Sequence, residues 1–364
     1  MFIPRHKYLF FIERERSIWT QQEIIRYLNS YGIAPCCITK ERASYDSLKD
    51  EFSFSALSMI NEMKIWWSDY DVMLSETYGI WDYSKMILAT SKKFGKTNLV
   101  IGNFPAINNF KPTFKGHYSP ENTTLIDGIC LIDKRTEECM NQINPDLDTL
   151  VTGNPEWDIV KTFKFKEEVK AVREKYGDNL LLLCAGPFDF FVKEQEEYYK
   201  RIIDQAEEQD FNVIVNFHAE SESIPDYFKG HINTVSHRYV NLVAASHIIT
   251  RVASGITQES LLFNKNVASN PFLFLGEKDA ETGLYHEWIE NDNRWKEKTL
   301  PRVGYELFNM LPLINNKQSL TDFLSSDKLR YSTGDLDEIF GMPKVSSFRE
   351  HFFLTVEEYM DGKK

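Results

Sequence analysis

The chain has 364 residues, with 42 basic and 54 acidic side chains and a formal net charge of −12. A field of that sign disfavours broad contact with nucleic acid or with an anionic bilayer, although a local basic patch could still bind one phosphate ligand. The length predicts two domains of ordinary size. No run of about 18 apolar residues occurs, which argues against a spanning helix. The five cysteines are scattered without a CxxC pair, which is typical of reduced thiols in a cytoplasmic protein.

Strand-like and helix-like patterns alternate through the first half of the chain. The apolar, β-prone runs are residues 7–13, 34–39, 70–76, 97–103, 127–134 and 149–154. Helical spacing covers residues 17–32, 53–69 and 81–95. The short apolar run near the N-terminus has charges on both sides, so it predicts a first buried strand rather than a signal peptide. Alternating elements of this length predict a mostly parallel sheet covered by helices on both faces.

The same pattern restarts in the second half, after a charged helix predicted over residues 163–179. The later strand-like runs are residues 180–186, 211–218, 247–250 and 266–275, and the helical ones are 193–210 and 239–246. We therefore predict an α/β fold with two Rossmann-like domains, residues 1–160 and 161–340, facing a ligand-binding cleft. Residues 341–364 predict an amphipathic helix that packs back across the first domain or caps the second.

The loops that follow the predicted strands of the second half are the places to look for chemistry. Residues 151–160 contain an Asn-Pro turn signal. Gly186 lies in an Ala-Gly-Pro turn that could bring backbone amides close to a ligand, or that could be only a turn. His218 ends an apolar strand, where a structural and a functional role are equally expected. Glu220 and Glu222 follow it, but HxExE lacks the spacing of a metal site, so we predict no metal.

The segment TRVASGITQES, residues 250–260, leaves a predicted strand and enters a predicted helix. Ser254 can cap this helix and Gly255 allows close approach, so the free amides of the first turn could bind a diphosphate. Glu259 is predicted in that first turn. There it would either stabilise the helix through its dipole or accept the two hydroxyls of a ribose, and the residue pattern favours neither role.

Taken in order, these segments resemble the UDP-N-acetylglucosamine 2-epimerase and GT-B glycosyltransferase superfamily. VTGNPEWDIV (151–160) is similar to the epimerase VTGN-x-x-x-D segment at the junction between domains, and VASGITQES (252–260) to its SGG-[IL]-Q-E-E nucleotide segment. VIVNFHAES (213–221) is similar to a strand ending in His-Pro, and NLVAASHIIT (241–250) to an Asn-Leu-Met helix with its following strand. The order matches over residues 150–272, whereas the first 150 residues agree only in their α/β alternation.

The sequence also departs from the epimerase pattern. The second Gly of SGG is not retained, Ala219 replaces the Pro of His-Pro, and AGPFDFF (185–191) stands where epimerases have a His-Arg-Arg motif. The looser SG-x-x-x-E segment and the Gly-Asn-Pro junction look more like bacterial surface-polysaccharide glycosyltransferases and CDP-glycerol glycerophosphotransferases. In either family the resemblance implies that Gly186 lines the phosphate side of the donor site.

The same resemblance implies roles for the other residues around the donor. Ser254, Gly255 and Thr257 would hold the donor phosphates, Glu259 would hold the ribose, and His218 would meet a phosphate or leaving-group oxygen. A helix terminus and hydrogen-bond donors could stabilise a departing nucleoside diphosphate, so neither a metal ion nor another cofactor is implied.

Transfer with inversion also requires a base, which this resemblance places in the first domain. Glu76 and Asp82 flank the exit of the strand at residues 70–76 and are the first candidates for the base, although the residue pattern favours capping and solvated charge for both. Glu13 and Glu15, after the first strand, are a second choice. His117, in a loop, is a third.

The leading hypothesis is a cytoplasmic glycosyltransferase that moves a sugar from a nucleotide-activated donor to a glycan or lipid-linked acceptor in surface-polysaccharide assembly. The alternatives are a UDP-sugar 2-epimerase or hydrolase, and a catalytically degenerate nucleotide-sugar-binding protein of an assembly complex. A peripheral membrane contact could use Lys92, Lys93 and Lys96, or Lys111 and Lys115, but these lysines lie on a helix end and a loop, which favours a solvated surface.

Overall fold

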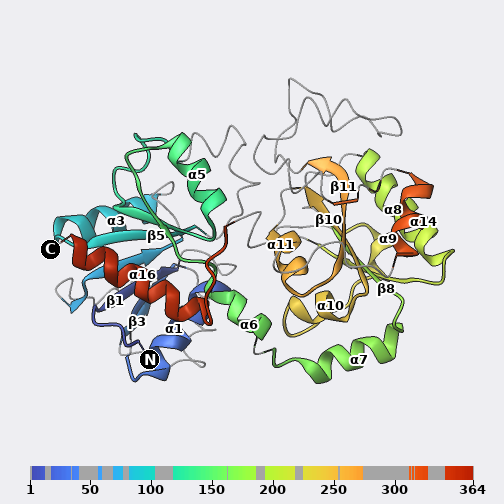
Figure 1. Ribbon diagram of the computed structural model, residues 1–364, viewed down its shortest axis with the longest axis horizontal. Helices are drawn as coiled ribbons and strands as arrows, with labels where there is room; N and C mark the ends of the chain where they lie inside the picture. Colours follow the sequence, from blue (N-terminus) through green and yellow to red (C-terminus); the bar gives the residue numbers. More distant parts are fainter. Residues whose placement is uncertain are drawn as a thin grey trace. The chain divides into compact units, whose positions relative to one another are not determined.

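The chain forms two compact units, each with its own parallel sheet (Figure 1). The computed structural model describes residues 2–12, 18–33, 35–40, 56–59, 69–76, 82–102, 118–161, 163–185, 193–217, 224–252, 255–273, 311–312, 314, 316–326 and 341–363. Unit 1 comprises Met1–Lys161 and Phe340–Lys364, and unit 2 comprises Thr162–Ile339. The chain therefore passes between the units twice, and the C-terminal segment belongs to unit 1.

Unit 1 is built on a seven-stranded parallel sheet with the order β3-β2-β1-β4-β5-β6-β7. Its strands are β1 (Tyr8–Ile12), β2 (Cys36–Thr39), β3 (Ala56–Met59), β4 (Val72–Ser75), β5 (Thr97–Gly102), β6 (Gly128–Leu131) and β7 (Asp148–Val151). The order reverses direction between β1 and β4. The carboxyl ends of these two strands therefore flank the topological switch point, where open α/β sheets bind ligands.

The edge strand β3 contradicts the helix predicted over residues 53–69. Residues Ala56–Met59 pair in parallel with Cys36–Thr39 of β2. In this segment the apolar residues fit helical spacing, but they also alternate with serines, which is a strand pattern. Pairing with the free edge of β2 decides between the two, because a short segment takes its conformation from its neighbours rather than from its own propensity.

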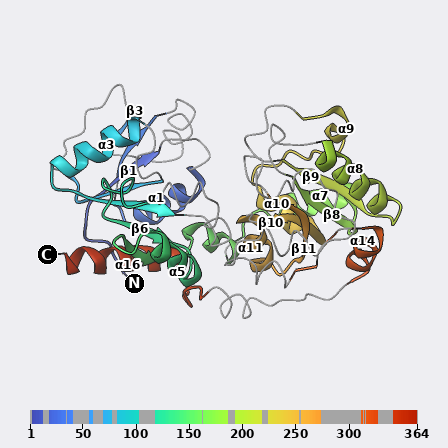
Figure 2. The ribbon, with the colours of Figure 1, turned by 90° about the horizontal axis from the view of Figure 1, so that it is seen from above.

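Helices cover both faces of the unit 1 sheet (Figure 2). They are α1 (Ile18–Ser30), α3 (Asp82–Lys93), α5 (Lys134–Ile143), the 3₁₀ turn η5 (Pro155–Trp157), α6 (Asp158–Lys161) and α16 (Phe348–Gly362). Alternate β1 residues point to opposite faces, as the two-residue period of a strand requires. Tyr8, Phe10 and Ile12 join the core under α1 and α16, whereas Leu9 and Phe11 join the core under α3 and α5.

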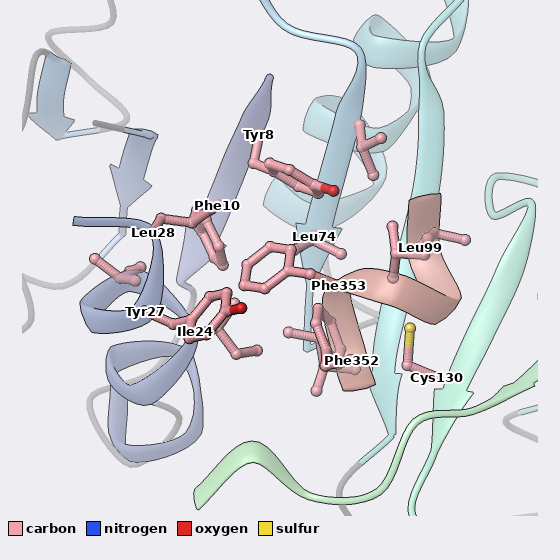
Figure 3. Close-up of a cluster of buried hydrophobic side chains, with 14 of the residues drawn as sticks. Tyr8, Phe10, Ile24, Tyr27, Leu28, Leu74, Leu99, Cys130, Phe352 and Phe353 are labelled. Atoms are coloured by element: carbon pink, nitrogen blue, oxygen red, sulfur yellow. The ribbon is translucent and has the colours of Figure 1, made fainter. Parts of the chain in front are cut away.

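The C-terminal helix α16 is part of the unit 1 core. Phe352 and Phe353 are fully buried, and Figure 3 shows their rings between α1 and the strands of the sheet. The Phe353 ring stacks on Tyr27 at 5.4 Å and meets Tyr8 edge-on at 5.1 Å between centroids. The predicted C-terminal helix therefore packs against the first unit.

Asp158 fixes the start of α16. Its Oδ1 accepts the backbone N–H of Phe348 at 2.7 Å, and its Oδ2 accepts the Ser347 hydroxyl at 2.7 Å and the backbone N–H of Arg349 at 3.1 Å. The Nε of Arg349 also donates to Oδ2, at 2.9 Å, while its Nη1 reaches Glu23 of α1 at 3.3 Å. Asp158 is the acid of the VTGN-x-x-x-D segment, so in this chain that acid caps the final helix.

Gly153, in the same segment, is required by two separate constraints. Its φ is +71°, a region that L-residues occupy at a cost. A Cβ built on it would lie 2.4 Å from the Phe348 ring at the start of α16. We expect Gly153→Ala to lower the free energy of unfolding of unit 1 by about 2–4 kcal/mol, combining backbone strain with overpacking.

Chemical denaturation with hydrogen exchange of α16 measures this loss. Gly32→Ala is the matched control, because Gly32 also belongs to unit 1 and has a similar φ of +73° but open space at its Cβ position. The Gly153 variant should lose clearly more stability than the control. Equal losses would mean that contact with Phe348 contributes nothing.

Unit 2 contains a four-stranded parallel sheet with the order β11-β10-β8-β9. The strands are β8 (Leu180–Cys184), β9 (Asn212–Asn216), β10 (His247–Val252) and β11 (Asn266–Leu273). The helices are α7 (Lys166–Tyr176), α8 (Lys193–Glu207), α9 (Asp226–Lys229), α10 (Tyr239–Ala244), α11 (Gly255–Leu262) and α14 (Lys317–Leu324). Side chains of α8 and α14 pack with Leu181, Leu183 and Val213 in the core on one face of this sheet.

Candidate functional site

The turn from β10 into α11 lies at the carboxyl edge of the unit 2 sheet. β10 ends at Val252 and α11 begins at Gly255, so the helix starts where the sequence predicts. Ser254, the expected cap, lies outside the described residues. The amides at the start of α11 have no partner within the helix, because the first four N–H groups of any α-helix have none. They are the groups that could meet a phosphate.

The side chain of Thr257 holds this helix to its strand. Thr257 is buried, and its Oγ1 lies 2.9 Å from Oγ1 of Thr250 in β10. That hydroxyl is therefore engaged inside the unit. A phosphate contact from Thr257 would have to come from its backbone N–H.

Glu259 does not lie in the first turn, contrary to the sequence prediction. α11 begins at Gly255 and its first turn contains no acidic residue, so Glu259 is in the second turn. The helix-dipole explanation for this acid loses force, because the effect falls off within the first turn. The side chain is only 5% exposed, and a carboxylate this buried needs a charged or hydrogen-bonding partner.

Arg238 is that partner, and the sequence reasoning missed it. Its Nη2 donates to Oε1 of Glu259 at 2.5 Å. The guanidinium lies 4.9 Å from the centroid of the Tyr239 ring, and Nη2 also donates to the Tyr239 hydroxyl at 3.2 Å. Arg238 remains 43% exposed. The site therefore presents a partly exposed cation held over a buried carboxylate, a suitable arrangement beside an anionic nucleotide.

An aromatic cluster supports the turn that carries Arg238. Phe165 stacks on His237 at 5.0 Å, and His237 meets Tyr239 at 4.8 Å. Phe263, just after α11, meets Tyr239 at 5.2 Å and Phe163 at 5.8 Å. The first described residues of unit 2 are therefore packed against the turn that positions Arg238 and against the residue that follows α11.

The Asn-Leu segment has a structural role. Asn241 of α10 donates to Asn233 O at 2.9 Å and to Asn216 Oδ1 at 3.4 Å, while Asn233 Nδ2 donates back to Asn241 Oδ1 at 2.8 Å. Asn216 is the last residue of β9. This amide network fixes the carboxyl end of β9, two residues before His218.

The other predicted donor residues follow neighbouring strands. Gly186 comes shortly after β8 and His218 shortly after β9, and both lie outside the described residues. Because β10, β8 and β9 are adjacent and parallel, their carboxyl ends meet at one edge of the sheet. The strand order is thus consistent with one site built from Gly186, His218 and the start of α11, although the roles of these residues stay predictions.

The candidate bases of unit 1 follow β4 and precede α3. Glu76 comes directly after β4 and is half-buried, and Asp82 is the first residue of α3. The side chain of Asp82, like Glu13, Glu15 and His117, lies outside what the structure describes. β4 and β1 are neighbours, so the chain leaves both strands at the switch point of this sheet. The base therefore stays a prediction.

Lys265 of unit 2, a half-buried lysine, has a structural role. Nζ of Lys265 donates to the carbonyls of Val243 at 2.6 Å and Ala245 at 2.9 Å, where α10 ends. Burial, with a smaller contribution from Arg173, lowers the pKa of Lys265 to about 8. Arg173 donates to Val243 and Ala244 of the same turn. The lysine therefore caps a helix at the edge of the sheet opposite the candidate site.

A hollow of about 340 Å³ in unit 1 is also at the wrong edge for the predicted chemistry. Its lining residues are Arg5, His6, Asp71, Gly95, Lys96, Thr97, Met360 and Asp361. These lie where β1, β4 and β5 begin, whereas open parallel sheets bind ligands where strands end.

Across the described stretches, no three His, Cys, Asp or Glu side chains are grouped as metal ligands. In the same stretches no helix is long and apolar enough to cross a bilayer.

Comparison with known proteins identifies the fold. No protein-family model matches the chain, and no curated protein matches it in sequence. Among solved structures, a protein of Listeria monocytogenes described as a UDP-N-acetylglucosamine 2-epimerase has a TM-score of 0.63 at 13% identity, covering 99% of this chain and 98% of that one.

Two further structures show the breadth of the likeness. The Methanocaldococcus jannaschii UDP-GlcNAc 2-epimerase, solved with UDP-GlcNAc and UDP, has a TM-score of 0.58 at 12% identity and covers 97% of this chain and 99% of its own. The glycotransferase of kitacinnamycin has a TM-score of 0.54 at 9% identity, covering 99% of this chain and 100% of its own. The chain therefore has the α/β fold shared by UDP-GlcNAc 2-epimerases and GT-B glycosyltransferases, as the resemblance in sequence predicts.

Proposed function

We propose that the chain is a glycosyltransferase that binds a nucleotide-activated sugar on unit 2 and transfers the sugar to a glycan or lipid-linked acceptor. The observation that carries the proposal is the buried Glu259 held by Arg238 beside the start of α11. A fold shared over nearly the full length with enzymes solved with UDP and UDP-GlcNAc supports a nucleotide sugar as the ligand.

In this proposal the start of α11 receives the diphosphate. Free amides and the positive end of the helix dipole offset the negative charge that develops as the glycosidic bond breaks. Glu259 accepts ribose hydroxyls, and Arg238 fixes the carboxylate and contributes a positive charge to the site. A base in unit 1, with Glu76 and Asp82 as the candidates, would take the acceptor proton.

Epimerisation is the second candidate, and the fold comparisons favour it. Several of the similar solved structures are UDP-GlcNAc 2-epimerases that cover almost the whole chain. The sequence favours transfer instead, because AGPFDFF occupies the place of the epimerase His-Arg-Arg motif. Incubation with UDP-GlcNAc alone separates the two. A sugar nucleotide inverted at C2 supports epimerisation, whereas release of UDP only when an acceptor is present supports transfer.

Nucleotide binding is the first test. A nucleotide at 100 times its dissociation constant should add about 2.7 kcal/mol to the free energy of unfolding of the unit that binds it. We expect UDP, or another nucleoside diphosphate in a panel of UDP, CDP, GDP and ADP, to raise the melting temperature of the wild type. Glu259→Gln should lose most of this shift, because an amide presents a donor where the ribose and Arg238 both need an acceptor.

Glu208→Gln is the matched control. Glu208 also pairs with a cation of the same unit, Lys317 at 2.8 Å, but the pair is exposed. The control should keep the full nucleotide shift. If both variants keep it, or if no nucleotide shifts the wild type, the carboxylate at 259 has only a structural role and the donor site is elsewhere.

A further inference from the structure

The outward face of α3 is unusually apolar for a surface helix. Ser84, Ile87, Leu88 and Ser91 are buried, and Ile87 and Leu88 pack in the core beneath the helix. The exposed side carries Tyr83, 44% exposed, and Met86, 47% exposed, and Phe94 directly after the helix is 56% exposed. The large exposed hydrophobic residues of the described stretches are Ile3, Tyr83, Met86, Phe94, Tyr227 and Leu354. Half of them therefore fall on this one element.

Positive charge is concentrated on the same element. After Asp82, the first residue of α3, residues 83–98 contain four lysines and no acidic residue, in a chain whose net charge is −12. Lys85 and Lys93 are exposed. Lys96 lies 5.6 Å from the Tyr70 ring centroid, and Lys40, from the end of β2, lies 5.4 Å from the Tyr83 ring centroid.

The acidic groups near this helix do not cancel that charge. Asp127 pairs with Lys92 at 2.5 Å and with Lys363 at 3.8 Å, so Lys92 is the lysine of α3 that it neutralises among the described residues. Asp71 lines the same hollow as Lys96, and Asp69 is exposed before β4. Lys85 and Lys93 remain exposed, Lys85 directly before Met86 and Lys93 about two helical turns after it.

We propose that α3 and Phe94 form a contact surface for an anionic phospholipid membrane. The exposed side chains of Tyr83, Met86 and Phe94 enter the headgroup and acyl boundary, and Lys85 and Lys93 bind the phosphate groups of the lipids. Lysine stems add apolar contact while their ammonium groups stay in water. This surface is part of unit 1 alone, and its existence does not depend on the nucleotide chemistry of unit 2.

The shape and charge of the surface favour a membrane over a protein partner. α3 lies on the outside of the sheet, on the face opposite α16 (Figure 2), so the surface is the convex back of a helix. The hollow found in the described part of unit 1 is at the beginning of the strands rather than on this helix. A lipid surface accepts a convex amphipathic helix, and its negative charge complements the lysines.

Co-sedimentation with vesicles tests the proposal. The full chain is spun with vesicles of phosphatidylcholine mixed with phosphatidylglycerol, and with phosphatidylcholine alone, at low and high salt. We expect binding to the anionic vesicles only, weakened by salt because the contact is partly electrostatic. Lys85→Glu with Lys93→Glu should reduce binding roughly tenfold or more. Met86→Ser with Phe94→Ser should also reduce it.

Matched controls come from helices elsewhere on the chain. Lys166→Glu with Lys170→Glu changes two exposed lysines of α7, and Leu354→Ser changes an exposed leucine of α16. Both should sediment as the wild type does, and circular dichroism checks that every variant is folded. The proposal is overturned if the wild type does not bind anionic vesicles, or if the α3 variants and the controls bind equally.

A second readout separates lipid binding from self-association. Sedimentation velocity without vesicles should show that Met86→Ser with Phe94→Ser leaves the oligomeric state of the wild type unchanged. A wild-type oligomer that dissociates in this variant would make the surface an interface between copies of the chain and would overturn the proposal. A nucleotide-induced melting shift that persists in all of these variants would show that the donor site is unaffected.

Discussion

Asp158→Ala is expected to lower the free energy of unfolding of unit 1 by roughly 3–5 kcal/mol. The carboxylate is 2% exposed and accepts hydrogen bonds from Ser347, from the backbone of Phe348, and from the backbone and side chain of Arg349. Alanine would leave two helix-start amides and a half-buried guanidinium without this acceptor. The loss of an ion pair adds to the loss of a helix cap.

Hydrogen exchange of the α16 amides measures this effect within unit 1, because local opening reports the stability of each region separately. The exchange rate of the α16 amides in Asp158→Asn should lie between the rates in the wild type and in Asp158→Ala. One side-chain oxygen remains as an acceptor, but the other is replaced by an NH₂ donor that faces donors. Glu138→Ala is the control, because Glu138 also belongs to unit 1 and pairs with a cation, Arg135 at 3.1 Å, but is exposed. Unchanged exchange in Asp158→Ala would refute the anchoring role.

Glu357→Leu is the second large expected effect, with a loss of roughly 3–5 kcal/mol. Oε1 of Glu357 accepts the backbone N–H groups of Arg5 and His6, both at 2.9 Å, and the Tyr8 hydroxyl at 2.8 Å. Oε2 lies 2.8 Å from Nδ1 of His6. The Glu357 side chain is 1% exposed, so leucine would bury these donors without an acceptor. Glu357→Gln should lower the free energy of unfolding by less, because its remaining side-chain oxygen can still accept hydrogen bonds from the donors on one side.

The contribution of Glu357 should also depend on pH. Burial alone raises the pKa of Glu357, but hydrogen bonds from His6, Tyr8 and Arg5 outweigh it and hold the pKa below the ordinary value of 4.5. A lowered pKa in the folded state gives a stabilisation that is fully present above pH 4.5 and is lost as the pH falls through the folded pKa. The stability difference between the wild type and Glu357→Gln should therefore shrink on acidification below pH 4.5. A constant difference down to pH 3 would contradict this linkage.

Local sequence pattern was sufficient for most of the architecture. The buried runs LLLLC of β8 and YLFFI of β1 are apolar throughout, which strands covered on both faces require. β3 shows where pattern fails, because its few apolar residues fit two periodicities and only pairing with β2 chooses between them. The start of α11 followed from the Ser-Gly step, but because the helix begins at Gly255, Glu259 is its fifth residue and lies beyond the first turn.

The side-chain partners of the site could not be predicted in the same way. Arg238 and Glu259 are 21 residues apart and meet only because α10 and α11 are both packed on the same sheet. Asp158 and Ser347 are 189 residues apart. The VTGN-x-x-x-D resemblance identified Asp158 by position but gave no indication that its role is to hold the last helix. Such pairings depend on tertiary packing, which periodicity does not encode.

The place of α16 in unit 1 also sets an order of folding during synthesis. Unit 2 is one continuous stretch, Thr162–Ile339, and all of it is synthesised before α16. The core beneath α16 needs Phe352, Phe353 and Val356, so the sheet face carrying Tyr8 and Phe10 is covered only in part, by α1, although its strands were made first. Exposed apolar surface of this kind is what chaperones bind and what drives aggregation. A chain released early, before residue 347, would contain all the strands that the structure describes and still leave its first unit without a finished core.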